Sequence, residues 1–227
     1  MAAQGPLIPR HGGYRNLKSF QVAQLVYDLT GLFCNTYVSG RSRTHDQMVQ
    51  AARSGVQNIA EGSQASATSK ATEMKLTNVA RASLEELRLD YEDFLRQHSL
   101  SQWNRTDPRR EKLIALRPRT LEDVKRWAQS TRAGHTASTA STASTASTAS
   151  TASTASTAST ASTVSTSSTQ STFPSAETLA NAALALINVA TFLLTRQLGA
   201  QAAAFERDGG FTERLHVSRT SRIDHSV

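Results

Sequence analysis

Cysteines, phosphate-binding glycine loops and clustered metal ligands are scarce or missing in this sequence. One cysteine among 227 residues cannot form an internal disulfide. The six histidines have neither the spacing nor the cysteine partners of a zinc site. Walker, dinucleotide-binding and nucleophile-elbow motifs are absent. We therefore expect a protein that is not an enzyme and holds no metal or cofactor.

Two weaker signals keep an alternative open. Glu213 and His216 have the Glu-x-x-His spacing of a metal site in a helical bundle, but such a site needs this motif on two helices. An unrecognised enzymatic site would have Glu61, Arg81 and Glu85 as its least implausible polar cluster. Neither signal assigns a reaction.

The N-terminus and the single cysteine bear on the location of the protein. Residues 1–14 lack the apolar stretch of a secretory signal. Cys34 occupies an apolar position in a helical pattern, which favours a small buried hydrophobe over a reactive thiol. A chain with so little cysteine fits a reducing compartment. We expect a cytoplasmic protein.

A tripeptide repeat interrupts the second half of the chain. Residues 137–163 are nine consecutive copies of Ala-Ser-Thr. Such a composition buries almost no apolar surface and cannot offset the entropy lost on ordering. We predict a disordered low-complexity linker over residues 135–173.

Apolar residues recur every three or four positions in four long segments, which is typical of amphipathic helices. The first spans residues 17–37, and the second begins near His45 after a Thr44/Gln47 capping box and ends at Gly62. The third follows Ser69 as N-cap for about thirty residues, and the fourth runs from Ser175 to Gly209.

Two shorter helices are predicted between the third and fourth long ones. The first, residues 108–116, is capped by Asp107, and the second, residues 120–127, starts at Thr120 with Asp123. No run of alternating strand residues occurs. The apolar stretch 179–198 is interrupted by polar residues, which favours a buried helix over a membrane span.

These elements predict an all-α fold, an antiparallel up-down four-helix bundle with one long connection between its third and fourth helices. The connection contains the disordered Ala-Ser-Thr repeat. The predicted organisation is a flexible N-terminus (1–13), bundle helices one to three (14–99), a basic satellite segment (100–134), the linker (135–173), bundle helix four (174–210) and a C-terminal tail (211–227).

Positive charge is concentrated just before the repeat. The chain has a net charge of +7, and residues 100–134 contain nine Lys or Arg against four Asp or Glu. Such a segment attracts phosphates or acidic proteins, or it only maintains solubility. The nucleic-acid-binding candidates are Arg41, Arg43, Arg105, Arg109, Arg110, Lys112, Arg117, Arg119, Lys125 and Arg126. Trp103 and Trp127 nearby either stack on bases or dock the short helices on the bundle.

The second and third helices contain a distinctive polar motif. Residues 54–62 read SGVQNIAEG, and residues 79–87 read VARASLEEL. Asn58 and Glu61 could satisfy backbone groups near the helix end or pair with Arg53 or Arg81 across the bundle. Together with Glu85 these residues form a predicted structural polar network.

The motif, together with Glu73, Leu76 and residues 90–95 (DYEDFL), resembles the four-helix-bundle proteins related to those encoded in 23S ribosomal RNA intervening sequences. Residues 193–197 (LLTRQ) and 209–214 (GGFTER) are similar to the branch called four helix bundle suffix domain proteins. The resemblance implies a bundle that assembles into a ring, commonly a pentamer, with no established enzymatic activity.

One related group, the accessory variability proteins of diversity-generating retroelements, forms a basic pentameric barrel that binds a reverse transcriptase and nucleic acid. This chain departs from that group in its extra segment, residues 100–172, and in the near-neutral charge of its last helix. Two hypotheses remain. The protein is an oligomeric module that binds nucleic acid or a nucleic-acid-processing enzyme, or it is a structural scaffold with no nucleic-acid role, and neither needs a membrane.

Overall fold

The computed structural model describes residues 13–140 and 174–209, and for residues 132–140 and Asp208 it describes the backbone alone. These ranges contain the short 3-10 helix η1 (Tyr14–Asn16) and six α-helices. The α-helices are α1 (Lys18–Tyr37), α2 (Arg43–Ala65), α3 (Lys70–Gln97), α4 (Pro108–Leu116), α5 (Leu121–Ala140) and α6 (Ala176–Asp208). No strand occurs in the described ranges, so the prediction of an all-α protein is confirmed.

Three helix starts follow their predicted caps. The side-chain oxygens of Ser69, Asp107 and Ser175 each accept a hydrogen bond from a backbone N–H of the first turn of α3, α4 and α6. Pro108 occupies the first position of α4, where its missing N–H costs nothing. Local side-chain chemistry therefore determines where these helices begin.

Both predicted ends of α2 were wrong. Ser42, rather than the Thr44 box, caps α2, because its hydroxyl accepts from the N–H of Thr44 and the helix begins at Arg43. At its other end α2 continues past Gly62 to Ala65, since that glycine packs against α3 and does not terminate the helix.

The predicted end of α5, and with it the start of the linker, was also wrong. α5 runs beyond Trp127 to Ala140, and alanine, which is frequent here, is the strongest helix former. The predicted linker over residues 135–173 therefore starts with helical backbone up to Ala140. The rest of the linker, the flexible N-terminus before residue 13 and the C-terminal tail lie outside the described residues.

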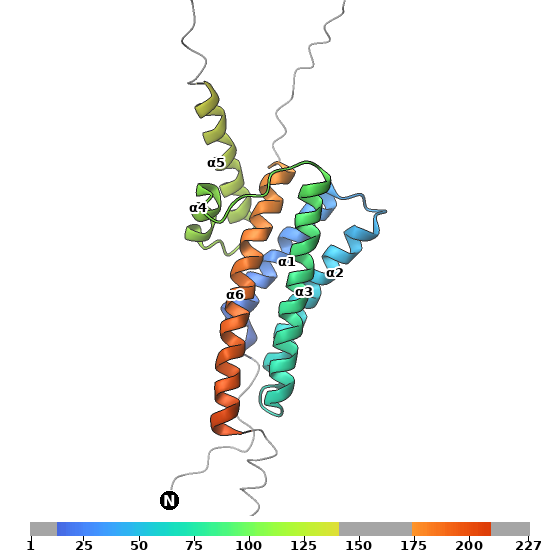
Figure 1. The fold of residues 1–227 in the computed structure, drawn as a ribbon, viewed down its shortest axis with the longest axis vertical. Helices are drawn as coiled ribbons and strands as arrows, with labels where there is room; N and C mark the ends of the chain where they lie inside the picture. Colours follow the sequence, from blue (N-terminus) through green and yellow to red (C-terminus); the bar gives the residue numbers. More distant parts are fainter. Residues whose placement is uncertain (1–12, 141–173, 210–227) are drawn as a thin grey trace, which may run out of the picture.

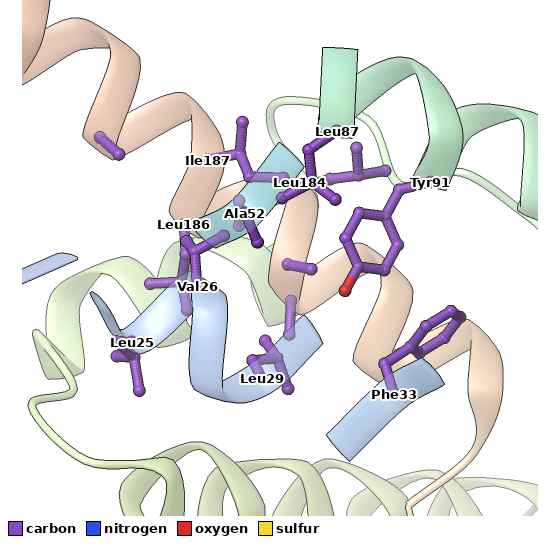
Figure 2. Packing of buried hydrophobic residues seen from close by; sticks show 14 of the residues in the cluster. Leu25, Val26, Leu29, Phe33, Ala52, Leu87, Tyr91, Leu184, Leu186 and Ile187 are labelled. Carbon is purple, nitrogen blue, oxygen red and sulfur yellow. The ribbon is translucent and has the colours of Figure 1, made fainter. Parts of the chain in front are cut away.

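Four long helices, α1, α2, α3 and α6, form what we call the four-helix core. Each packs against two of the others: α1 against α2 and α6, and α3 against α2 and α6. Figure 1 shows them side by side, with α4 and α5 set beside the upper half of α6. Figure 2 shows the apolar side chains that meet between them, including Leu29 and Phe33 of α1, Tyr91 of α3 and Ile187 of α6.

Two hydroxyl groups at the centre of this core are paired. The hydroxyl of the fully buried Tyr91 donates to Thr30 Oγ1 at 3.1 Å, and Thr30 donates to the carbonyl of Val26. Cys34 is fully buried, which confirms its predicted position, and burial raises the pKa of its thiol to about 12. A thiol with such a pKa is almost entirely protonated at neutral pH and so is a poor nucleophile.

Two glycines allow α2 and α3 to approach closely. A Cβ added to Gly55 would lie 2.8 Å from Leu84 Cδ2 and 3.0 Å from its Cγ. A Cβ on Gly62 would lie 3.2 Å from the backbone oxygen of Glu73. Beside Gly55, the Ser54 and Ser83 hydroxyls form a hydrogen bond of 2.9 Å between the two helices. The glycines of the sequence motif thus determine how near these helices lie.

We predict that Gly55→Ala and Gly62→Ala each destabilise the protein by about 1–3 kcal/mol, because the added methyl forces α2 and α3 apart. The control is Gly199→Ala in α6, where an added Cβ meets nothing within 4 Å. That substitution should stabilise the helix by up to about 1 kcal/mol. Urea denaturation of the three variants measures the differences. Equal changes in stability at all three glycines would contradict the close approach of α2 and α3.

Candidate nucleic-acid interface

A nine-residue stretch near the start of α6 is buried on every side of the helix. The nine consecutive residues from Leu179 to Ile187 are all buried. Nine residues of an α-helix pass more than twice around its axis, so two core neighbours cannot cover them. Contacts of α4 and α5 with α6 supply the remaining cover. We call residues 100–131 the docked segment.

α6 is also, among the described residues, the one helix long and apolar enough to cross a membrane. Of its most apolar stretch, 61% is buried inside the protein. That burial is what a core helix of a soluble domain shows, so the apolar composition has a structural explanation in this fold.

Both tryptophans anchor the docked segment. Trp103 and Trp127 are 8% and 6% exposed, and their rings meet edge to face with centroids 6.0 Å apart. The indole N–H of Trp103 donates to Glu177 Oε1 at 3.2 Å. Trp127 Nε1 is buried and has no hydrogen-bond partner in the described part of the chain, so packing alone holds this ring. Of the two predicted roles, docking is the one that this burial permits, because a base cannot reach either ring face.

Asn181 of α6 fastens the start of the docked segment. Its Oδ1 accepts from the backbone N–H of Trp103 at 2.8 Å, and its Nδ2 donates to the carbonyl of Ser101 at 2.8 Å. The same amide nitrogen also donates to the carbonyl of Glu177 at 2.9 Å. Asn181 is 3% exposed. Its loss would leave buried backbone groups without partners, which is costly in a dry interior.

Three of the candidate cations are engaged within the docked segment. Arg109 forms a two-pronged pair with Asp107, at 2.8 Å and 3.1 Å, and its guanidinium lies 4.1 Å from the centroid of the Trp103 ring. The Arg109 side chain holds the pKa of the Asp107 carboxyl below its ordinary value. Lys125 and Arg126 pair with Glu122 and Asp123, three residues earlier on α5. These three cations stabilise the segment and offer less free charge to a partner.

Asp123 also caps α5. Its Oδ2 accepts from the backbone N–H groups of Arg119 and Thr120, both at 3.0 Å, and its own N–H donates to Thr120 Oγ1. These bonds lower the pKa of the Asp123 carboxyl from 3.8 to about 2. Because the pKa of Asp123 is depressed in the folded state, its carboxylate stabilises the fold fully above pH 3.8. This stabilisation is lost as the pH falls through about 2. At neutral pH the cap is fully formed.

Within the described residues, five candidate cations of the docked segment have no carboxylate partner: Arg105, Arg110, Lys112, Arg117 and Arg119. Arg110 donates to the backbone carbonyl of Arg105, and the other four side chains are exposed. Of the four acids in the docked segment, Glu111 alone has no ion pair in the part of the chain that the structure describes. The segment thus presents an excess of four positive charges around α4 and the connection to α5.

Arg41 and Arg43 lie apart from this group, in the connection before α2 and at its first position. Both are exposed. Among the described residues, no hydrogen bond or ion pair joins either side chain to the docked segment. These two arginines were predicted to bind nucleic acid together with the basic segment on the basis of their charge alone.

The motif of α2 and α3 forms a different polar network from the predicted one. Asn58 donates to the carbonyl and the hydroxyl of Ser54, so it satisfies a backbone group on its own helix. Arg81 donates to Asn78 one turn earlier, and Glu85 pairs with Arg88 at 2.6 Å. No ion pair of Arg53 or Glu61 occurs within the described residues, and both side chains are exposed. The contact across the two helices is the Ser54–Ser83 bond.

In the described residues no three His, Cys, Asp or Glu side chains come together as they would around a metal ion. Glu213 and His216 lie outside these residues. Comparison of the chain with protein families, with curated proteins and with solved structures found no match. The resemblance to intervening-sequence bundle proteins therefore stays a prediction.

We predict that Asn181→Ala releases the docked segment from α6 and costs about 2–4 kcal/mol through its buried, unpaired backbone groups. Because both tryptophans of the chain belong to this segment, their fluorescence emission should shift to longer wavelength. Asn188→Ala, a half-buried asparagine on the same helix, is the control and should leave the emission unchanged. An unshifted emission in both variants would show that Asn181 does not fasten the segment.

Proposed function

We propose that this protein is a non-enzymatic interaction module that binds nucleic acid, alone or together with a nucleic-acid-processing enzyme. The supporting observation is the group of unpaired cations on the docked segment, with four exposed side chains: Arg105, Lys112, Arg117 and Arg119. Phosphate groups are the ligands that such a group attracts, and each neutralised phosphate releases a counterion.

The proposed architecture that supports this surface is an antiparallel up-down four-helix bundle. Contacts near the helix ends favour it. Ser19 near the start of α1 donates to Gln197 late in α6, whereas Tyr37 at the end of α1 donates to the carbonyl of Pro174, just before α6. Gln201 late in α6 donates to Glu73 and Thr77 near the start of α3. These pairs fit neighbours that run in opposite directions.

The proposed mode of binding is through the phosphate backbone. The four cations are exposed, with Arg105 before α4, Lys112 on it, and Arg117 and Arg119 in the loop that follows it. The tryptophans are buried and do not serve as stacking platforms. Affinity without base stacking or contacts with base edges depends on charge, so it should fall steeply with salt and vary little with sequence.

We predict that reversing four cations together, Arg105→Glu, Lys112→Glu, Arg117→Glu and Arg119→Glu, weakens binding to RNA and DNA at least tenfold in 0.1 M salt. The plot of log K against log salt should lose a slope of roughly 3, because four phosphate contacts disappear. Gel retardation or fluorescence anisotropy with a 20-nucleotide probe measures both quantities.

The control reverses four exposed cations on the core, Arg53→Glu, Lys75→Glu, Arg81→Glu and Arg196→Glu. It changes net charge by the same amount at a distance from the docked segment. Equal weakening in both variants would show non-specific attraction to a basic protein. The absence of any salt-dependent binding by the wild-type protein would refute the proposal.

A second candidate is a structural scaffold, a cytoplasmic homo-oligomer in which the core supplies contacts between copies. Two large apolar side chains on the core favour it: Leu89 of α3 is 55% exposed and Phe192 of α6 is 60% exposed. Exposed side chains of this kind gain free energy when a partner covers them. The ring that the resemblance implies, commonly of five copies, is one such assembly.

We predict that Leu89→Lys together with Phe192→Lys dissociates this oligomer and leaves the fold intact, because both side chains are already exposed in one copy. Light scattering after gel filtration gives the mass, and circular dichroism reports the helix content. Gln57→Lys with Gln24→Lys, two exposed polar positions, is the matched control. A wild-type protein that is monomeric at micromolar concentration would rule out the scaffold.

A further inference from the structure

An open groove lies beside α1, at the start of α5. It measures about 520 Å³ and is bordered by α1, the first turns of α2 and the first residue of α5. Its lining residues are Tyr27, Asp28, Gly31, Leu32, Asn35, His45, Val49 and Leu121. A volume of this size is in the range of small-molecule sites in proteins.

The docking of α5 completes this groove. Leu121 closes one side, although it is far from α1 and α2 along the chain. Gly31 keeps the groove open, since a Cβ added there would meet nothing within 4 Å. Leu32, Val49 and Leu121 provide an apolar lining, and the Tyr27 ring adds an aromatic group.

The polar groups at the rim of the groove differ in their hydrogen-bond and ion-pair partners. The His45 ring is held between Asn35 Oδ1, 3.1 Å from its Nε2, and Asp46 Oδ1, 3.3 Å from its Nδ1. Asp28 makes no hydrogen bond or ion pair within the described residues. Asp28 is an exposed residue, and desolvation of the covered part of its side chain raises the pKa of the carboxyl. A cation placed in the groove would relieve this cost.

We propose that the groove binds a small organic ammonium ion, whose cation pairs with the Asp28 carboxylate and whose apolar body packs on Leu32, Val49 and Leu121. The Tyr27 ring can add a cation–π contact. An anionic ligand with the same apolar body would meet the Asp28 charge and bind weakly. The groove lining includes none of the four cations proposed to bind phosphate, so either proposal can fail without the other.

Three probes with a similar apolar body separate charge from hydrophobic contact: phenethylammonium, 2-phenylethanol and 3-phenylpropionate. Titration of the full-length protein, followed by NMR shifts of the backbone amides of the groove, gives the dissociation constants. Phenethylammonium should bind at least fivefold more tightly than either other probe, and the shifts should concentrate at the groove residues of α1 and α2.

One substitution tests the charge of the site, and another tests its open volume. Asp28→Asn should reduce the preference for the ammonium probe to less than twofold, and Glu61→Gln, whose exposed side chain does not line the groove, should leave it unchanged. Gly31→Leu should fill the groove and abolish binding of all three probes while circular dichroism stays as in the wild type. Equal affinity for the three probes, or an unchanged preference in Asp28→Asn, would overturn the proposal.

Discussion

The apolar surface of the nine-residue stretch near the start of α6 is the constraint on which the rest of the structure depends. Leu179 to Ile187 must be covered on all sides, and α1 and α3 cover only part of that surface. The docked segment supplies the remainder through Trp103 and Trp127, with Asn181 joining the two parts. Because this cover uses the apolar face of α4 and α5, their cations remain at the outer surface. The basic face and the groove beside Leu121 both follow from that docking.

The fold was largely predictable because its signals are local. Helical periodicity and the caps Ser69, Asp107 and Ser175 lie within a few residues of the ends that they determine. The errors arose where local and tertiary signals compete. Gly62 looks like a helix stop in the sequence, yet its lack of a side chain serves contact with α3 and the helix continues to Ala65. A glycine's role in packing cannot be recognised until its neighbour is known.

The positive charge of the candidate site could be predicted from the sequence, but its side-chain contacts could not. The basic excess of residues 100–134 is visible in the sequence. Lys125 and Arg126 were predicted as free cations, although Glu122 and Asp123 lie three residues earlier on the same helix face, a spacing at which ion pairs form. The bond between Asn181 and Trp103 spans 78 positions, and the groove joins α1 to Leu121, so neither has a local signature. Long-range packing decides which cations are free.

The most direct test of the docked segment is acrylamide quenching of tryptophan fluorescence in the native, full-length protein. Both indoles lie within this segment and are less than a tenth exposed. The structure predicts emission at short wavelength and quenching several-fold weaker than in the urea-unfolded chain. Quenching of the native protein as strong as that of the unfolded chain would contradict the docking of residues 100–131 on α6.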